Sequence, residues 1–371
     1  MKAVRTSLDA TAVPDRPAGG GRYVLELASA LARRDDVDVT VVTRRGDGAR
    51  WRELGRTSVM ERAPAARPLR LMWEQVALPR LLRDLAVDVH HGPHYTMPQR
   101  ASLPKVVTIH DVTFFEHPEW HERSKAPFFR RAIRVAAERA QALVCVSAVT
   151  AARLDALVTP KAAVHVIPHG VDHTRFCPSP GRDDEAMLAG LGVRPPFAAF
   201  VGTLEPRKDV PTLVRAFDRI AATHPDLSLV IAGLEGWGAA AVGEAIADAA
   251  HRDRVRRLGY LAEAAVPALL RTASVVAYPS LDEGFGLPAL EALACGAPLV
   301  TTEGTAMAEV TGDAALLVPA GDAAALAGAL EAALDGGADI EDRRRRGIER
   351  AAAFTWDKSA AAHAEVYRSV L

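Results

Sequence analysis

Two basic residues stand together in the segment GTLEPRKD (202–209), directly after an apolar run that predicts a strand. A helix is expected next, with Asp209 as its N-cap and Pro211 in its first turn. An Arg–Lys pair beside a helix N-terminus suits a diphosphate, because Arg207 supplies a fork of donors and Lys208 a mobile point charge. A solvated turn is the alternative interpretation of the same residues.

Two glutamates occur in the segment DEGFGLPALE (282–291). Gly284 and Gly286 allow backbone amides to come close to a ligand, and a helix that opens at Pro288 is expected to hold Glu291 in its first turn. Carboxylates that face a nucleotide accept hydrogen bonds from sugar hydroxyls. The alternative is local: Glu291 caps the helix and Glu283 lies on a loop surface.

A glycine triplet and several histidines follow predicted strands in the first half of the chain. Gly19, Gly20 and Gly21 precede a helix, but the GxGxxG spacing of a dinucleotide fingerprint is absent. His110 ends one strand, and HHGPH (90–94) follows another. The His spacing there admits a metal, yet no Cys or paired acidic ligand accompanies it, so we predict no metal site.

The order of elements is that of an α/β protein, because short apolar runs alternate with helical patterns throughout the chain. Ligands of such parallel sheets bind beyond the carboxyl ends of the strands, where the segments above fall. Strands are expected at 3–8, 37–43, 87–91, 106–110, 143–147 and 163–168, then at 197–203, 227–232, 255–258, 275–279 and 299–302. Helices are expected at 21–33, 69–85, 126–140 and 148–157, then at 210–222, 239–249, 264–272, 288–294 and 323–334.

Composition indicates a folded protein of two domains, since the 371 residues are 49% hydrophobic and 25% charged. The net charge of −1 conceals an asymmetry: residues 1–175 hold 27 Lys and Arg against 19 Asp and Glu. Such a basic half suits an anionic partner, although a chance split between two solvated surfaces explains it equally well. Three scattered cysteines without a CxxC pair and the lack of a signal peptide or spanning segment predict a cytoplasmic protein.

Taken together, these residues resemble the nucleotide-sugar glycosyltransferases of family 4, in their mannosyltransferase-like subgroup. The most specific part is Glu283-x7-Glu291, which is similar to the donor signature of that family. The segments VGTLEPRKD, IAGLEG and LGYL precede it in the order of the family. In the first half, GGGRYVLELASAL, WEQVALP, HHGPHYTMP, TIHDVTFFEHPEW, VSAVTAARL and IPHGVD carry the likeness. Two departures are Asp209, where Asn or Gly is usual, and His169, where many members have Asn.

The resemblance implies a GT-B fold of two Rossmann-like domains that face each other across a cleft. It makes residues 1–172 with 355–371 an acceptor-binding domain and residues 173–354 a donor-binding domain. Arg207 and Lys208 bind the diphosphate, Glu283 contacts the donor sugar, and Glu291 holds the ribose. His110 lines the reaction centre. Further donor contacts are implied for Gly19, Gly20, Gly21, Gly202, Gly284, Phe285, Gly286 and Leu287, with Leu234, Glu235 and Tyr260 at the nucleobase.

The implied activity is transfer of a hexosyl residue, with retention, from a nucleotide sugar to a glycan, glycolipid or other small acceptor, without metal or cofactor. GDP-mannose is the expected donor and a UDP-hexose the alternative; no nucleic-acid partner is expected. An NDP-sugar epimerase and a non-catalytic sugar-nucleotide-binding protein are the competing functions. A glycosidase with Glu283 and Glu291 as its acid and nucleophile is a further alternative, although it needs no phosphate site.

Peripheral association with an anionic membrane is a separate hypothesis. A helix over 126–140 is expected to place apolar side chains on one face between cations, which is typical of an interfacial helix. An ordinary packed helix with a basic solvated face is the alternative. The residues concerned are Arg123, Lys125, Arg130, Arg131, Arg134 and Arg139, with Phe128, Phe129, Ile133 and Val135.

Overall fold

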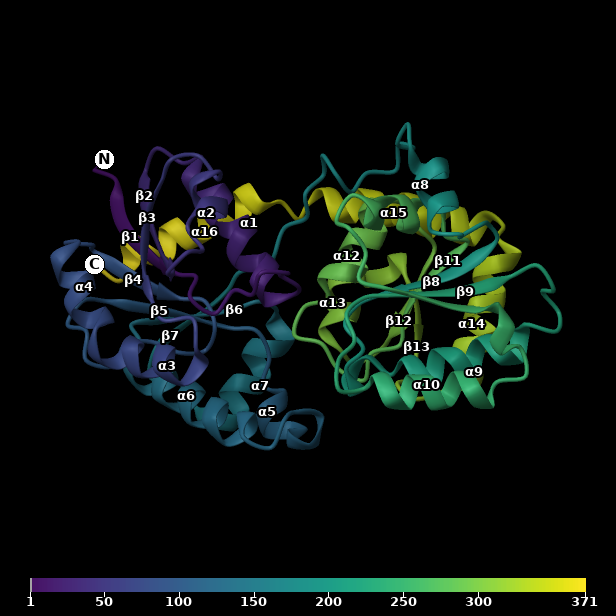
Figure 1. Ribbon diagram of the computed structural model, residues 1–371, viewed down its shortest axis with the longest axis horizontal. Coiled ribbons are helices and arrows are strands. Elements are labelled where there is room, and N and C mark those ends of the chain that lie inside the picture. Colours follow the sequence, from purple (N-terminus) through teal and green to yellow (C-terminus); the bar gives the residue numbers. More distant parts are fainter. Residues whose placement is uncertain (1) are drawn as a thin grey trace. The chain divides into compact units, whose positions relative to one another are not determined.

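The computed structural model describes residues 2–371 and divides into two compact units (Figure 1). Of the described residues, unit 1 comprises 2–170 and 355–371, and unit 2 comprises 171–354. The division at 170/171 lies two residues before the domain boundary expected from the sequence, and the second division lies at the expected place. Unit 2 is thus one continuous segment, whereas unit 1 is built from both ends of the chain.

Unit 1 contains a seven-stranded sheet in the order β3-β2-β1-β4-β5-β6-β7, and every strand pair is parallel. Parallel sheets of this kind are covered on both faces, and the inner strands β5 and β6 are accordingly buried at every residue. The strands are β1 (Val4–Asp9), β2 (Val37–Arg44), β3 (Thr57–Ala63), β4 (Val89–Gly92), β5 (Lys105–Ile109), β6 (Ala142–Cys145) and β7 (Ala163–Val166).

The helices of unit 1 lie against this sheet, and the last of them comes from the end of the chain. Helix α16 (Trp356–Ser369) packs beside α1 (Gly20–Ala32), as the yellow and purple ribbons of Figure 1 show. The others are α2 (Ala49–Arg52), α3 (Arg67–Val76), α4 (Leu78–Asp84), α5 (Thr113–Glu116), α6 (Lys125–Arg139) and α7 (Ala148–Val158), with the 3₁₀ turn η1 (Pro118–Trp120).

Unit 2 contains a six-stranded parallel sheet in the order β10-β9-β8-β11-β12-β13. Its strands are β8 (Phe197–Val201), β9 (Ser228–Ala232), β10 (Val255–Gly259), β11 (Val275–Tyr278), β12 (Leu299–Thr302) and β13 (Leu316–Val318). Its helices are α8 (Asp184–Gly190), α9 (Val210–Ile220), α10 (Ala239–Asp248), α11 (Ala265–Thr272), α12 (Leu287–Ala294), α13 (Ala306–Thr311), α14 (Ala323–Asp335) and α15 (Ala338–Ala352), with 3₁₀ turns η2 (Pro206–Lys208), η3 (Arg252–Arg254) and η4 (Gly312–Ala314).

The predicted α/β class with two Rossmann-like domains is confirmed, and the differences lie mainly at the sheet edges. Strands β3 and β13 were not expected; β3 carries polar residues along an edge, and β13 has only three residues. The single helix expected over 69–85 is two helices that meet at Ala77, because Pro79 enters the first turn of α4. Helices α13 and α15 were also not predicted.

No helix within residues 2–371 combines the length and the apolar character that crossing a membrane requires.

Candidate active site

The order of the strands in unit 2 brings the two chemically distinctive segments together. Strand β8 pairs with β9 on one side and with β11 on the other, so the connections that follow β8 and β11 leave the sheet at a topological switch point. The turn η2 follows β8, and the loop before α12 follows β11. The amide of Leu281 donates to the carbonyl of Arg207 at 2.8 Å, which fastens the two segments to each other.

A compact charge cluster results from this contact. The carboxylate of Glu283 accepts from Arg207 through one oxygen and from Lys208 through the other, and it also accepts from the hydroxyl of Ser280 at 3.2 Å. On its other side, Arg207 donates from Nε to Glu205 at 2.9 Å. Lys208, Ser280 and Glu283 are buried, while Arg207 is half-buried. Two cations are therefore held by two carboxylates at the edge of the sheet.

Burial and charge act in opposite directions on this cluster. Burial alone raises the pKa of Glu283, but the adjacent Arg207 and Lys208 outweigh it and hold the pKa of Glu283 at about 2. Burial, together with the charge of Arg207, lowers the pKa of the Lys208 ammonium from its usual range. Neither Arg207 nor Lys208 is an exposed side chain, because both form ion pairs with the buried Glu283.

Helix α12 begins at Leu287 rather than at Pro288, which corrects the placement of Glu291. The first turn of α12 contains no acidic residue, and Glu291 follows it. The side chain of Glu291 is buried. Gly286 precedes the helix with φ of 100°, and a Cβ there would lie 2.4 Å from the Cγ of Met307. A residue without a side chain is therefore required at the start of α12. Phe285 and Leu287 on either side of it are buried, and Gly284 precedes them in the loop.

Helix α9 begins where the sequence predicted, but its N-cap residue has an irregular conformation. Asp209 is its N-cap residue, with Pro211 in the first turn, but its backbone is left-handed with φ of 45° and its side chain forms no regular cap. Burial raises the pKa of the Asp209 carboxyl.

Gly202, at the end of β8, donates its amide to the carbonyl of Ala232 at 2.8 Å.

The residues predicted to bind the nucleobase lie at the same sheet edge. Leu234 follows β9, Tyr260 follows β10, and these two strands are paired. The amide of Leu204 donates to the carbonyl of Leu234 at 3.0 Å. Tyr260 is 40% exposed, and Glu235 is exposed and forms an ion pair with Arg257 at 2.8 Å. The structure brings Leu234 and Tyr260 to neighbouring strand ends, while Glu235 is engaged at the surface.

In unit 1, the glycine triplet and the histidines meet at the corresponding switch point, since β1 pairs with both β2 and β4. Gly19 is the N-cap residue of α1, and Gly20 and Gly21 form its first turn. A Cβ on Gly20 would lie 3.0 Å from the Cε1 of His94 and 3.6 Å from the Nε2 of His110. The missing side chain thus lets the start of α1 approach two imidazoles.

His110 has one defined tautomer in this structure. Its Nε2 lies 2.7 Å from the carbonyl oxygen of Pro93, and a carbonyl only accepts, so Nε2 carries the proton and donates. Burial lowers the pKa of His110, which keeps the ring neutral near pH 7. The Nδ1 atom is consequently an acceptor.

Behind His110 lies a buried chain of hydrogen bonds whose direction is fixed at one end. His363 donates from Nδ1 to the carbonyl of Ser359 at 2.8 Å, so its Nε2 accepts from Tyr23 at 2.9 Å. Tyr23 must then accept from Thr108 at 2.9 Å. Thr108 accepts in turn from Nε2 of His91 at 2.7 Å, and Nδ1 of His91 accepts from Tyr367 at 2.8 Å. We call these residues the Tyr23 network: Tyr23, His91, Thr108, Ser359, His363 and Tyr367.

The Tyr23 network joins α16 to the sheet and supports His110. The rings of Tyr23 and His110 are packed edge to face, with their centroids 5.1 Å apart. The ring centroid of His169 lies 4.7 Å from that of Tyr23. The network residues are buried, and burial lowers the pKa of His363 to about 4. The whole network is therefore uncharged at neutral pH.

The histidines that were considered as metal ligands are directed elsewhere. His90 contacts Ser7 at 2.8 Å on one face of β4, whereas His91 belongs to the Tyr23 network on the other face. His94 lies over His110, with ring centroids 5.5 Å apart. Within residues 2–371, no three His, Cys, Asp or Glu side chains are grouped as metal ligands.

Sequence reasoning missed several polar residues of both units. Glu205 lies within the segment 202–209, where its nearness to the basic pair could have indicated it, whereas Ser280 lies just before the segment 282–291. Tyr278, whose buried hydroxyl has no partner within residues 2–371, is the last residue of β11. Of the Tyr23 network, only His91 was considered, because hydrogen bonds between distant segments leave no local pattern.

Two family models match the chain in succession. The model described as "Glycosyltransferase Family 4" matches residues 17–175, and "Glycosyl transferases group 1" matches residues 188–353. Each match contains the charged or histidine-rich switch point of one unit. The chain belongs to the glycosyltransferases of family 4 and group 1. It is thus an enzyme of the glycosyltransferase class.

Among curated proteins, this glycosyltransferase is 28% identical to the O-antigen chain mannosyltransferase B of Escherichia coli over 74% of the chain and 73% of that protein. It is 33% identical to the D-inositol 3-phosphate glycosyltransferase of Kineococcus radiotolerans over 56% of the chain. That alignment covers 52% of the relative, so the chain matches about half the length of this second enzyme.

Solved structures of other glycosyltransferases share the fold. A sucrose-phosphate synthase from Thermosynechococcus elongatus superimposes with a TM-score of 0.82 at 22% identity, covering 99% of this chain and 98% of the other. Anabaena HepE in complex with UDP-glucose gives 0.78 at 19% identity, covering 98% and 99%. The glycosyltransferase WaaG gives 0.77 at 16% identity, covering 97% and 99%. These glycosyltransferase likenesses establish the GT-B fold.

Proposed function

We propose that this enzyme transfers a hexosyl residue from a nucleotide sugar to a glycan, glycolipid or other small acceptor, with retention of configuration. Unit 2 binds the donor and unit 1 the acceptor in this proposal. GDP-mannose is the proposed donor, supported by the likeness to a mannosyltransferase. A UDP-hexose is the second candidate, because HepE is described in complex with UDP-glucose.

The observation that carries the proposal is the cluster of Arg207, Lys208 and Glu283 at the switch point of unit 2. Two adjacent cations can neutralise the charge that develops on a departing diphosphate, which lowers the barrier electrostatically. In this structure Glu205 and Glu283 neutralise the two cations. A diphosphate must therefore displace at least one carboxylate, and Glu283 would then be released toward the hydroxyls of the donor sugar.

The roles proposed for unit 1 follow from the state of His110. A neutral imidazole with a fixed Nε2 proton can accept a hydrogen bond from a hydroxyl through Nδ1. Gly19, Gly20 and Gly21 would let backbone amides of α1 approach the donor phosphates. These contacts are predictions for the ligand-bound enzyme.

The identity of the donor is tested with purified protein and a panel of nucleotide sugars. GDP-mannose and GDP should raise the melting temperature, and GDP-mannose should be hydrolysed slowly without an acceptor. If only UDP-glucose and UDP raise the melting temperature, the donor is a UDP-hexose instead of GDP-mannose. Isomerisation of the sugar without release of nucleotide would indicate an epimerase, and stabilisation without any turnover would indicate a binding protein.

Substitution of the two glutamates of the donor signature should have different effects on turnover and on binding. Glu283→Gln is expected to lower kcat by about two orders of magnitude, or about 2.7 kcal/mol, because a contact that strengthens in the transition state is lost. The same change frees Arg207 and Lys208, so binding of GDP should be equal or tighter. Glu291→Gln should instead weaken binding of the donor and of GDP by about 1–3 kcal/mol.

Steady-state kinetics and titrations with free nucleotide separate these outcomes. A wild-type kcat for Glu283→Gln at saturating donor and acceptor would contradict the catalytic role of Glu283. Unchanged binding by Glu291→Gln would contradict the ribose contact.

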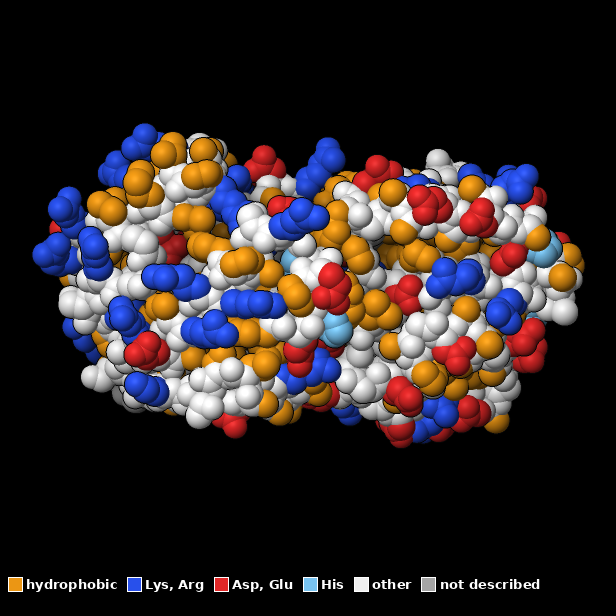
Figure 2. Space-filling view, turned by 90° about the horizontal axis from the view of Figure 1, so that it is seen from below, with side chains coloured by type: hydrophobic (Ala, Val, Ile, Leu, Met, Phe, Trp, Pro, Cys, Tyr) orange, Lys and Arg blue, Asp and Glu red, His pale blue; other side chains and the backbone are white. Residues whose placement is uncertain are grey.

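Peripheral membrane association remains part of the proposal, but the surface expected for it was wrong. The apolar side of α6 faces inward: Ile133 is fully buried, and Phe129 stacks on Phe114 at 4.5 Å. Helix α3 instead exposes Leu69, Met72 and Val76 by 51–59%. Lys and Arg side chains lie among hydrophobic ones over unit 1 in Figure 2. Exposed apolar side chains beside cations suit an anionic membrane surface.

Liposome sedimentation at low salt tests this surface. Wild-type protein should prefer anionic to neutral vesicles, and Leu69→Ser with Met72→Ser should remove the preference. Equal sedimentation with both kinds of vesicle would exclude the association.

A further inference from the structure

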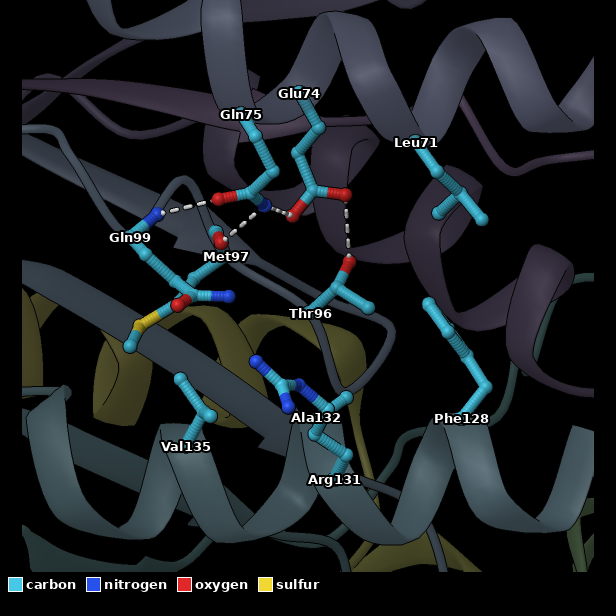
Figure 3. A pocket seen from close by; sticks show the side chains of 10 residues that line it. All are labelled: Leu71, Glu74, Gln75, Thr96, Met97, Gln99, Phe128, Arg131, Ala132 and Val135. Carbon is cyan, nitrogen blue, oxygen red and sulfur yellow. Dashed lines mark hydrogen bonds between the residues drawn. The ribbon is translucent and has the colours of Figure 1, made fainter.

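A small pocket in unit 1 has no role in the site described above. It lies between α3 and α6, is also lined by the loop after β4, and has a volume of about 170 Å³ (Figure 3). Pockets for drug-sized ligands hold roughly 300–1,000 Å³, so this one suits a single small group such as one sugar ring.

One wall of the pocket is polar and rigid. Glu74, from α3, is 6% exposed, and its two oxygens accept from Gln75 and from Thr96, each at 3.1 Å. Gln75 is held in turn by the carbonyl of Met97 and the amide of Gln99, each at 3.0 Å. One protein donor on each Glu74 oxygen leaves lone pairs unused, so the carboxyl group can accept further hydrogen bonds from a ligand.

The opposite wall comes from α6 and differs in character. Figure 3 shows the Arg131 side chain across the pocket from the Glu74 carboxyl, with Phe128 and Val135 on either side along the helix. Arg131 is exposed and makes no hydrogen bond or ion pair with any of residues 2–371. Phe128 is half-buried and offers an aromatic surface. A guanidinium and a carboxyl group thus line the same pocket without pairing to each other.

We propose that this pocket binds one pyranose ring of the acceptor, and that Arg131 selects a ring with an anionic substituent. The ring hydroxyls would bond to Glu74 and Thr96, its apolar edge would lie on Phe128, and a phosphate or carboxylate would pair with Arg131. The inference rests on the proposed transfer function, because it assigns the acceptor to unit 1. The excess of cations in residues 1–175 favours an anionic acceptor.

The test measures direct binding of three probes by saturation-transfer NMR and titration: mannose 6-phosphate, glucuronate and methyl mannoside. Both anionic sugars should bind more tightly than methyl mannoside, and a preference between them distinguishes a phosphate from a carboxylate. Arg131→Ala should reduce binding of the anionic probes about tenfold and leave methyl mannoside unchanged. Arg139→Ala, an exposed arginine near the end of the same helix, is the matched control.

A second variant tests the polar wall. Glu74→Leu should weaken binding of all three probes about tenfold, since its side chain offers neither an acceptor nor a donor to the ring hydroxyls. Absence of binding by every probe, or equal affinities for Arg131→Ala and wild type, would overturn the inference. Binding of GDP and UDP is measured on the same samples: intact nucleotide binding without sugar binding refutes the pocket alone, whereas loss of both refutes the proposed transfer function.

Discussion

The two units bury their acidic side chains in opposite ways. In unit 2, Glu283 is surrounded by Arg207 and Lys208, and its pKa lies near 2. In unit 1, Glu74 has only neutral hydrogen-bond partners, and burial together with the charge of Asp9 raises its pKa to about 8. Although the two glutamates are buried to a similar extent, Glu283 of unit 2 is a carboxylate and Glu74 of unit 1 is a carboxylic acid at neutral pH. The partners, rather than burial alone, decide the charge.

The same contrast extends to the neighbouring groups. The cluster of unit 2 consists of full charges, whose removal one at a time leaves an uncompensated ion. The Tyr23 network of unit 1 consists of neutral hydroxyl and imidazole groups, whose loss costs one or two hydrogen bonds. We therefore expect substitutions in unit 2 to cost more stability than substitutions in unit 1.

The largest effect is expected for Lys208→Ala, which leaves the buried Glu283 with Arg207 as its only ion-pair partner. Breaking a buried pair in this way costs about 3–5 kcal/mol in the free energy of unfolding. Adding Glu283→Gln should restore much of that stability, because the stranded charge is removed. Denaturant unfolding of both single variants and the double variant measures the coupling; additive effects would show that the pair is not coupled.

Nucleotide binding should follow a different pattern in the same variants. The double variant regains stability but keeps only one of the two cations, so its GDP affinity should stay below that of wild type. Full recovery of GDP binding by the double variant would show that Lys208 does not bind the diphosphate.

Glu74→Gln is expected to change stability with pH. The pKa of Glu74 is higher in the folded protein, at about 8, than its ordinary value of 4.5. Folding therefore takes up a proton between these values, and wild-type stability falls as pH rises from 4.5 to 8. Glutamine does not titrate, so the variant should gain on the order of 5 kcal/mol relative to wild type across this range. Asp9, whose pKa is also raised by burial, and Arg70 face the same site and are present in both proteins.

Unfolding curves at pH 5 and pH 8.5 provide the measurement. A constant stability difference at the two pH values would mean that Glu74 is ionised in the folded protein, and the contrast with Glu283 would disappear.

Smaller effects are expected in the Tyr23 network. Tyr367→Phe removes one donor to His91 and should cost about 1 kcal/mol. Tyr23→Phe leaves the Thr108 hydroxyl hydrogen without an acceptor and Nε2 of His363 without a donor, and it should cost about 2–3 kcal/mol. The order of the two values, read from thermal or chemical unfolding, is the decisive observation; a larger loss for Tyr367→Phe would contradict the bond directions derived above.

The smallest effect is expected for EDTA. Arg207 and Lys208 supply two positive charges where the diphosphate is proposed to bind, so chelation should leave transfer unchanged. Loss of activity that Mg²⁺ or Mn²⁺ restores would contradict the metal-independent mechanism.

Apolar periodicity predicted most strands to within two residues, since buried parallel strands are near-continuous apolar runs. It failed for β3, whose edge position tolerates polar residues, and for α15, whose sequence ADIEDRRRRGIERAA is mostly charged. Adjacency in sequence identified Arg207 and Lys208 but could not predict how far they are buried. The partner that buries them, Glu283, is more than seventy residues away, and only the strand order brings it near.

The assembly of unit 1 from both ends of the chain has a consequence for biosynthesis. Synthesis proceeds from the N-terminus, and domains usually fold in that order as they emerge. Here unit 2 is complete once residue 354 is made, whereas Tyr23 and His91 still lack His363 and Tyr367. Tyr23 and His91 therefore lack these two hydrogen-bond partners until α16 has been synthesised. On a ribosome stalled just before α16, all residues of unit 2 would be present, whereas unit 1 would lack its last helix.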